Sequence, residues 1–167
     1  GYTDSTESEK EPAQPVSEEI VEFCQSKLDE LLNQSKLFGQ TEVIRAENET
    51  VSLDIINPED PGRVIGKDGS TLNAFQTLLR AFVYNKFNTP LRIFVDSGEY
   101  KKKKIGSLQE KAKRIAKKVK QTGKAYDLEP MNAQERRSIH LLFEKDNDVS
   151  TFSAGEGRER HIIISKT

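Results

Sequence analysis

Hydrophobic side chains recur about every three or four residues in four stretches of the chain, which predicts four amphipathic helices. Ser17 precedes the first stretch and suits a helix N-cap. Asp96 and Glu99 have the spacing of a capping box before the third stretch. Asn132 and Glu135 repeat that spacing before the fourth. The predicted helices cover residues 17–33, 70–87, 97–122 and 132–143.

Short runs of alternating apolar and polar residues separate these helices and predict strands. The first two runs flank a polar turn at residues 47–49 and predict a β-hairpin. A proline-containing loop follows, and residues 63–65 are predicted to form one helical turn. The last two runs flank Gly155-Glu156-Gly157 and predict a closing hairpin. The predicted strands cover residues 41–45, 51–55, 91–95, 125–128, 150–154 and 158–165, so the fold class is α+β.

Charge is unevenly distributed along the chain, although the formal net charge is only -1. Residues 1–60 hold 4 Lys/Arg and 15 Asp/Glu, a difference of -11, and residues 61–167 hold 22 and 12, a difference of +10. Residues 100–124 carry 11 basic residues and one acid, Glu110. Because a polyanion meets a local surface rather than the average charge, the second part of the chain favours a nucleic-acid partner.

The tetrapeptide Gly66-Lys67-Asp68-Gly69 stands between an apolar run and a strong helical pattern. Neither glycine carries a Cβ, so this backbone can come close to a bulky partner such as a phosphodiester chain. The same tetrapeptide is also an ordinary turn in most proteins. Asp68 places a carboxylate where phosphates would come, and Lys67 offsets it only in part. An exposed charge contact of about 1 kcal/mol or less weakens binding without preventing it.

The order strand, helical turn, Gly-x-x-Gly, helix, strand resembles the minimal unit of KH domains, which clamp about four nucleotides. With a helix and a hairpin in front, the chain resembles the bacterial type of that fold, in which a helix packs on a small mixed sheet. The resemblance implies an apolar groove for bases, which Ile55, Val64 and Ile65 line unless they belong to the core. It also implies nucleic-acid contacts at Arg63, Gly66, Lys67, Asp68 and Gly69.

Arg136 and His140 lie four residues apart in the last predicted helix, and therefore on one of its faces. An arginine fork can bind phosphate in bidentate fashion, and an imidazole can stack on a base or donate to phosphate. The alternative is a solvated arginine and a half-buried histidine. The run Pro130–His140 and the hairpin Gly155–Arg160 resemble the Arg-x-x-x-His domain family of single-stranded nucleic-acid binders. This resemblance implies contacts from Arg136, Arg137 and His140.

A lysine-rich helix is predicted between the two motifs. Like charges four residues apart destabilise a helix, and lysines near its N-terminus oppose the helix dipole. A phosphate backbone relieves both penalties, so this helix is either a solvated face or a further contact with nucleic acid. The candidate contacts crowd its first turns, at Lys101, Lys102, Lys103 and Lys104.

A KH unit that runs directly into an Arg-x-x-x-His domain closely resembles the bacterial Jag (SpoIIIJ-associated) RNA-binding family over about residues 17–167. The resemblance implies a cytoplasmic protein that holds single-stranded RNA at both motifs. It further implies RNA-level control of cell-envelope growth and cell shape, division or sporulation, with a protein partner near the membrane-insertion machinery. The expected parts are an acidic disordered linker at 1–16, a KH domain at 17–97 and the Arg-x-x-x-His domain at 98–167.

Candidate catalytic and metal-binding residues are few. Two histidines, His140 and His161, and one cysteine, Cys24, offer no metal cluster, and no nucleophile–base pair can be assembled. We therefore expect no catalysis, no metal and no cofactor. A single cysteine agrees with a reducing cytoplasm. Two alternatives stay open. One is binding of single-stranded DNA, and the other is an adaptor that binds a protein through its acidic N-terminal region.

Overall fold

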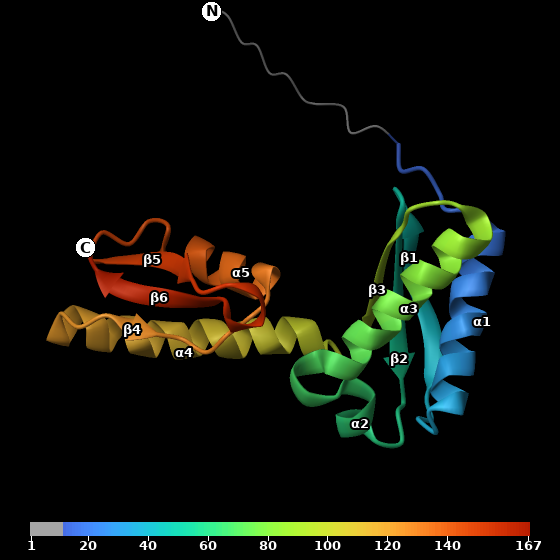
Figure 1. Cartoon of the computed structure of the whole chain (residues 1–167), viewed down its shortest axis with the longest axis horizontal. Helices are drawn as coiled ribbons and strands as arrows, with labels where there is room; N and C mark the ends of the chain where they lie inside the picture. Colours follow the sequence, from blue (N-terminus) through green and yellow to red (C-terminus); the bar gives the residue numbers. More distant parts are fainter. Residues whose placement is uncertain (1–11) are drawn as a thin grey trace, which may run out of the picture. The chain divides into compact units, whose positions relative to one another are not determined.

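The structure, a computed structural model, describes residues 12–167 and divides after Tyr100 into two compact units (Figure 1). The first unit contains a three-stranded sheet in the order β1-β2-β3. β1 and β2 are antiparallel, whereas β3 lies parallel to β2. The predicted helix packed on a small mixed sheet is therefore confirmed. Its elements are α1 (Glu18–Gln34), β1 (Gln40–Glu47), β2 (Thr50–Ile56), α2 (Pro61–Ile65), a 3-10 turn (Lys67–Gly69), α3 (Ser70–Phe87) and β3 (Arg92–Asp96).

The segment before α1 pairs with the end of the β1–β2 hairpin. The amide of Asn48 donates to the carbonyl of Gln14 at 2.7 Å, and the amide of Val16 donates to the carbonyl of Ala46 at 3.0 Å. These hydrogen bonds order the last residues of the linker predicted at 1–16, where sequence composition alone indicated disorder. Residues 1–11 of that linker lie outside the described residues.

α1 and α3 pack on the same face of this sheet and close one hydrophobic core (Figure 1). Each fully buried leucine or isoleucine contributes about 1.5–3 kcal/mol to this packing. Cys24 is part of the core, and burial raises the pKa of its thiol to about 11, so it stays protonated. The largest fully buried side chains here are Leu28, Leu32, Leu53, Ile55, Leu72, Leu79 and Ile93.

The second unit is a three-stranded antiparallel sheet in the order β4-β6-β5 with two helices. The inward side chains of α4 and α5 meet those of β5 and β6 in one core, which includes Ile115, Ile139, Ile162 and Ile164. None of the helices in the described part of the chain is both long and apolar enough to cross a membrane. The elements are α4 (Tyr100–Thr122), β4 (Tyr126–Asp127), α5 (Ala133–Phe143), β5 (Val149–Ala154), a 3-10 turn (Gly157–Glu159) and β6 (His161–Lys166).

The predicted capping box before α5 is present, whereas the one predicted before α4 is absent. Before α5, the amide of Glu135 donates to Asn132 Oδ1 at 2.9 Å, and Glu135 Oε2 accepts from the amide of Asn132 at 2.9 Å. Before α4, Glu99 lies outside the helix with a left-handed φ of 55°, and Asp96 Oδ1 accepts instead from the amide of Ser97 at 2.8 Å. A left-handed residue interrupts the geometry that a capping box requires.

Candidate nucleic-acid interface

The glycine loop connects α2 to α3 in the first unit, and its conformation requires glycine. Gly66 has a φ of 77°, a region that side chains rarely adopt. A Cβ at this position would lie 2.4 Å from Thr71 Oγ1 and 2.7 Å from the amide nitrogen of Thr71. The loop therefore turns tightly onto the N-terminus of α3, where amides and the helix dipole favour an anion.

The second glycine of the loop makes room for a side chain of the protein itself. Gly69 is buried and has a φ of 79°. A Cβ here would lie 3.0 Å from Cε1 of Tyr100. The missing Cβ of Gly69 thus accommodates the tyrosine ring within the first unit, whereas the sequence suggested that it admits a ligand backbone.

The charged residues of the loop region face solvent. Arg63, Lys67 and Asp68 are all exposed, and Asp68 adopts a left-handed φ of 53°. Asp60 Oδ1 caps α2 by accepting from the amide of Arg63 at 3.1 Å. One guanidinium (Arg63) and one ammonium (Lys67) therefore lie near two carboxylates, Asp60 and Asp68.

The apolar residues next to the loop divide between core and surface. Val64 and Ile55 are fully buried, so they belong to the core and do not line an open groove. Ile65 is half-buried at the edge of that core. Of the predicted base-binding side chains, only Ile65 offers accessible apolar surface.

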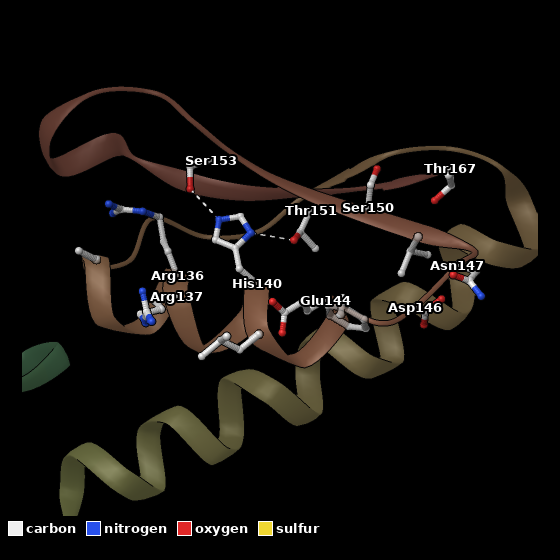
Figure 2. Close-up of a pocket in the computed structure, with 14 residues that line it drawn as sticks. Arg136, Arg137, His140, Glu144, Asp146, Asn147, Ser150, Thr151, Ser153 and Thr167 are labelled. Carbon is white, nitrogen blue, oxygen red and sulfur yellow. Dashed lines mark hydrogen bonds between the residues drawn. The ribbon is translucent and has the colours of Figure 1, made fainter. Parts of the chain in front are cut away.

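The second unit contains an open groove of about 1010 Å³ between α5 and β5. Figure 2 shows the arginines on α5 at one end of this groove, with acidic and amide groups at the other. His140 lies between them and points toward β5 (Figure 2). The polar lining residues are Arg136, Arg137, His140, Glu144, Asp146, Asn147, Ser150, Thr151, Ser153 and Thr167.

Arg136 is held in place at the start of α5. Its Nη1 donates to the carbonyl of Met131 at 2.8 Å, and its side chain is half-buried. One of its five N–H donors is used in this hydrogen bond, and Arg136 is one of the residues that line the groove. Arg137, which follows it, is exposed. The two guanidinium groups form the cationic end of the groove.

His140 bridges α5 to β5 through both ring nitrogens. Its Nδ1 lies 2.7 Å from Thr151 Oγ1, and its Nε2 lies 3.1 Å from Ser153 Oγ. Burial and, to a smaller extent, the charge of Arg136 lower the pKa of His140 below its usual value. The imidazole is thus fixed and favoured in its neutral form. The two hydroxyls hold the ring at the groove wall. A phosphate can therefore reach a ring nitrogen only by displacing one of them.

The other end of the groove is acidic, and a single ammonium, that of Lys120, pairs with two carboxylates there. Asp146 Oδ2 lies 2.8 Å from Lys120 Nζ, and Asp148 Oδ2 lies 3.3 Å from the same ammonium. The hydrogen bond from Lys120 lowers the pKa of Asp146. An anion entering the groove therefore meets its most favourable potential at Arg136 and Arg137.

The four lysines at the start of α4 differ in their surroundings. Lys102 and Lys103 are exposed, and Lys101 is half-buried. Lys104 Nζ lies 2.8 Å from Glu135 Oε1, and the Glu135 side chain is only 6% exposed. Lys104 is thus part of an internal ion pair that holds the start of α5, which differs from the solvent-facing contact expected from the sequence.

Two hydroxyls of the groove, Thr151 and Ser153, were missed by the sequence analysis. Their alternate positions in the predicted strand 150–154 place both side chains on one face of it. The local sequence does not indicate that this face contacts His140. The partners are 11 and 13 residues apart in sequence.

Two family profiles match the chain, each within one unit. The profile described as "KhpA/KhpB, KH domain" matches residues 24–95, and the profile of the Arg-x-x-x-His domain matches residues 106–166. The chain is therefore a KH domain of the KhpA/KhpB type followed by an Arg-x-x-x-His domain, and the predicted fold class is confirmed.

The curated relatives of the chain carry the name RNA-binding protein KhpB. The chain is 41% identical over 107 residues to the RNA-binding protein KhpB of Clostridium symbiosum, which covers 64% of this chain and 48% of the relative. It is 33% identical over 129 residues to that of Bacillus subtilis (76% and 62%), and 24% identical over 149 residues to that of Streptococcus pneumoniae serotype 2 (89% and 44%). The predicted resemblance to the Jag family is confirmed. The chain spans about half the length of the curated relatives it matches.

Proposed function

We propose that this chain is a non-enzymatic RNA-binding protein that holds single-stranded RNA with two modules. The observation that carries this proposal is the groove of the Arg-x-x-x-His domain, where Arg136 is held by Met131 and His140 is fixed by two hydroxyls. Such preorganisation lowers the entropy lost on binding. The names of the relatives, RNA-binding protein KhpB, agree with this proposal.

The Arg-x-x-x-His domain is proposed to bind phosphate at Arg136 and Arg137. A guanidinium fork can donate to two phosphate oxygens at once. The neutral imidazole of His140 presents its ring beside this fork, where an unstacked base can lie against it. His140 also positions the groove wall through Thr151 and Ser153.

The KH domain, proposed at residues 17–97, is expected to hold a second stretch of RNA. Arg63 and Lys67 supply positive charge, and the Gly66–Gly69 loop presents the N-terminus of α3. Lys102 and Lys103 add exposed charge at the start of the Arg-x-x-x-His domain, proposed at 98–167. Linking two weak sites raises the affinity for one long strand through effective concentration.

The cellular role is proposed from the family resemblance. We expect a cytoplasmic protein that acts in RNA-level control of cell-envelope growth and shape, division or sporulation, with a protein partner near the membrane-insertion machinery. No residue described above carries this part of the proposal.

Binding of fluorescent single-stranded RNA, measured by anisotropy, tests the proposed contribution of the Arg-x-x-x-His domain. Arg136→Ala and Arg137→Ala should each lose about 1–3 kcal/mol of binding free energy. Arg45→Ala is the matched control, because Arg45 is exposed, pairs with Glu47 at 2.9 Å and lies in the other unit. Losses below about 0.3 kcal/mol in both groove variants, with unchanged thermal stability, would show that the groove between α5 and β5 does not bind RNA.

Competition between matched RNA and DNA strands distinguishes RNA binding from binding of single-stranded DNA. Tighter binding of the RNA strand is expected if 2′-hydroxyls contribute to recognition. Equal or tighter binding of the DNA strand would assign the groove to single-stranded DNA.

A further inference from the structure

The outward face of α4 carries basic side chains that differ in whether an acid neutralises them. α4 has ten Lys and Arg residues. Four of them are bound to carboxylates of the second unit at 2.8–3.3 Å. These pairs are Lys104 with Glu135, Lys111 with Glu129, Lys113 with Glu110, and Lys120 with Asp146 and Asp148.

Three others, Arg114, Lys117 and Lys118, form no ion pair within residues 12–167, and we call them the α4 cationic triad. All three are exposed. Their spacing of three and four residues places them on one helix face, with side chains that are near neighbours. The buried residues Ile115 and Val119 lie on the opposite face, in the core of the unit.

The one acid on α4, Glu110, forms its ion pair with Lys113, and of the triad only Arg114 adds to the charge that lowers its pKa. Glu110 accepts from Lys113 Nζ at 2.9 Å. That hydrogen bond, together with the charges of Lys113 and Arg114, lowers the pKa of Glu110. Glu110 therefore stays ionised and is engaged by Lys113, one turn before the triad.

A triad of like charges on one helix face costs stability rather than adding it. An isolated small anion would relieve one of these charges, whereas a chain of phosphates relieves all three and releases its own condensed counterions. Charge complementarity thus favours a polyanionic backbone as the partner. The triad offers charge on a convex helix surface, which suits contact with phosphates rather than reading of a base.

We propose that the α4 cationic triad is a third RNA contact, which binds the sugar-phosphate backbone without regard to sequence. The proposal rests on the function proposed above and extends it, because neither the glycine loop nor the groove between α5 and β5 includes these residues. The triad lengthens the strand that one molecule can hold, and it contributes little to a short oligonucleotide held in the KH domain alone.

The test measures the affinity for poly(U) RNA as a function of salt concentration. Replacing Arg114 and Lys117 by Gln should lower the steepness of log K against log[salt] by about 1.4, since each phosphate contact of a single strand contributes about 0.7. Affinity for a tetranucleotide, which fills about one KH groove, should change less than about twofold. Arg114→Lys, which keeps the charge, should retain the full salt dependence and guards against a folding effect.

Replacing Lys111 and Lys113 by Gln is the matched control, because it removes the same charge from the same helix at residues already paired with acids. An equal loss of steepness in the Arg114/Lys117 variant and in the Lys111/Lys113 variant would overturn the proposal, since the effect would then follow net charge alone. Unchanged steepness in the triad variant, with Arg137→Ala still weakened, would also overturn it while leaving the proposed function intact. Loss of binding to anionic phospholipid vesicles, without any effect on poly(U), would reassign the triad to a membrane surface.

Discussion

Lys104 Nζ lies 2.8 Å from Glu135 Oε1, and this ion pair joins the first turns of α4 to the first turn of α5. Glu135 also closes the capping box with Asn132. The next residue, Arg136, is therefore presented from a helix end that three polar residues define. The position of the cationic end of the groove depends on this arrangement, because Arg136 itself donates to the carbonyl of Met131 just before the cap.

Lys104→Met should destabilise the Arg-x-x-x-His domain by about 1–3 kcal/mol, because it leaves the largely buried Glu135 carboxylate without its ammonium. Urea unfolding measures the change. Lys103→Met is the control and should stay within about 0.5 kcal/mol, since Lys103 is exposed. Adding Glu135→Gln to Lys104→Met should recover part of the loss, and a further loss of the same size would show that the pair does not couple.

Gly69→Ala should destabilise the KH domain more than Gly98→Ala does. Both glycines have positive φ, at 79° and 57°, so both substitutions cost about 1 kcal/mol of backbone strain. Only Gly69 has a close neighbour, Tyr100 Cε1 at 3.0 Å, whereas nothing lies within 4 Å of a Cβ at Gly98. The difference in unfolding free energy between the two variants measures the tyrosine contact, and equal values would show that the ring moves aside freely.

Asp68→Asn should strengthen RNA binding about two- to fivefold, because it removes an exposed carboxylate from a loop that is proposed to meet phosphates. Asparagine tolerates the left-handed backbone that Asp68 adopts, so the fold should be unaffected. Lys67→Asp changes the loop charge in the opposite direction and should weaken binding. Anisotropy titrations at low salt report both changes. Equal affinity of both variants and the unmodified chain would place the RNA away from this loop.

Local patterns predicted the elements and the i,i+4 pairs, but not which side chains meet across the fold. The Asn132–Glu135 box is a four-residue feature and was predicted correctly, and Arg136 and His140 share a face as expected. Four consecutive lysines look alike in sequence, yet Lys104 pairs with Glu135, which lies on a different helix. The hydroxyl partners of His140 depend on the pairing of a helix with a strand. Such partners follow from tertiary packing, which short-range periodicity does not encode.

His140 should make both stability and RNA binding depend on pH, with opposite signs. Its pKa is lowered in the folded protein, so the unfolded chain binds the proton more readily. The stability that the neutral ring contributes is therefore complete above its unfolded pKa of about 6.5 and is lost as the pH falls toward the folded value. A phosphate bound beside Arg136 favours the imidazolium, so RNA affinity should rise over the same interval. Unfolding and RNA titrations at about pH 7.5 and about pH 5.5, on either side of the ordinary histidine pKa, test both effects, with His140→Gln as the variant that lacks the titrating group. If that variant shows the same pH dependence as the unmodified chain, the proton is taken up elsewhere.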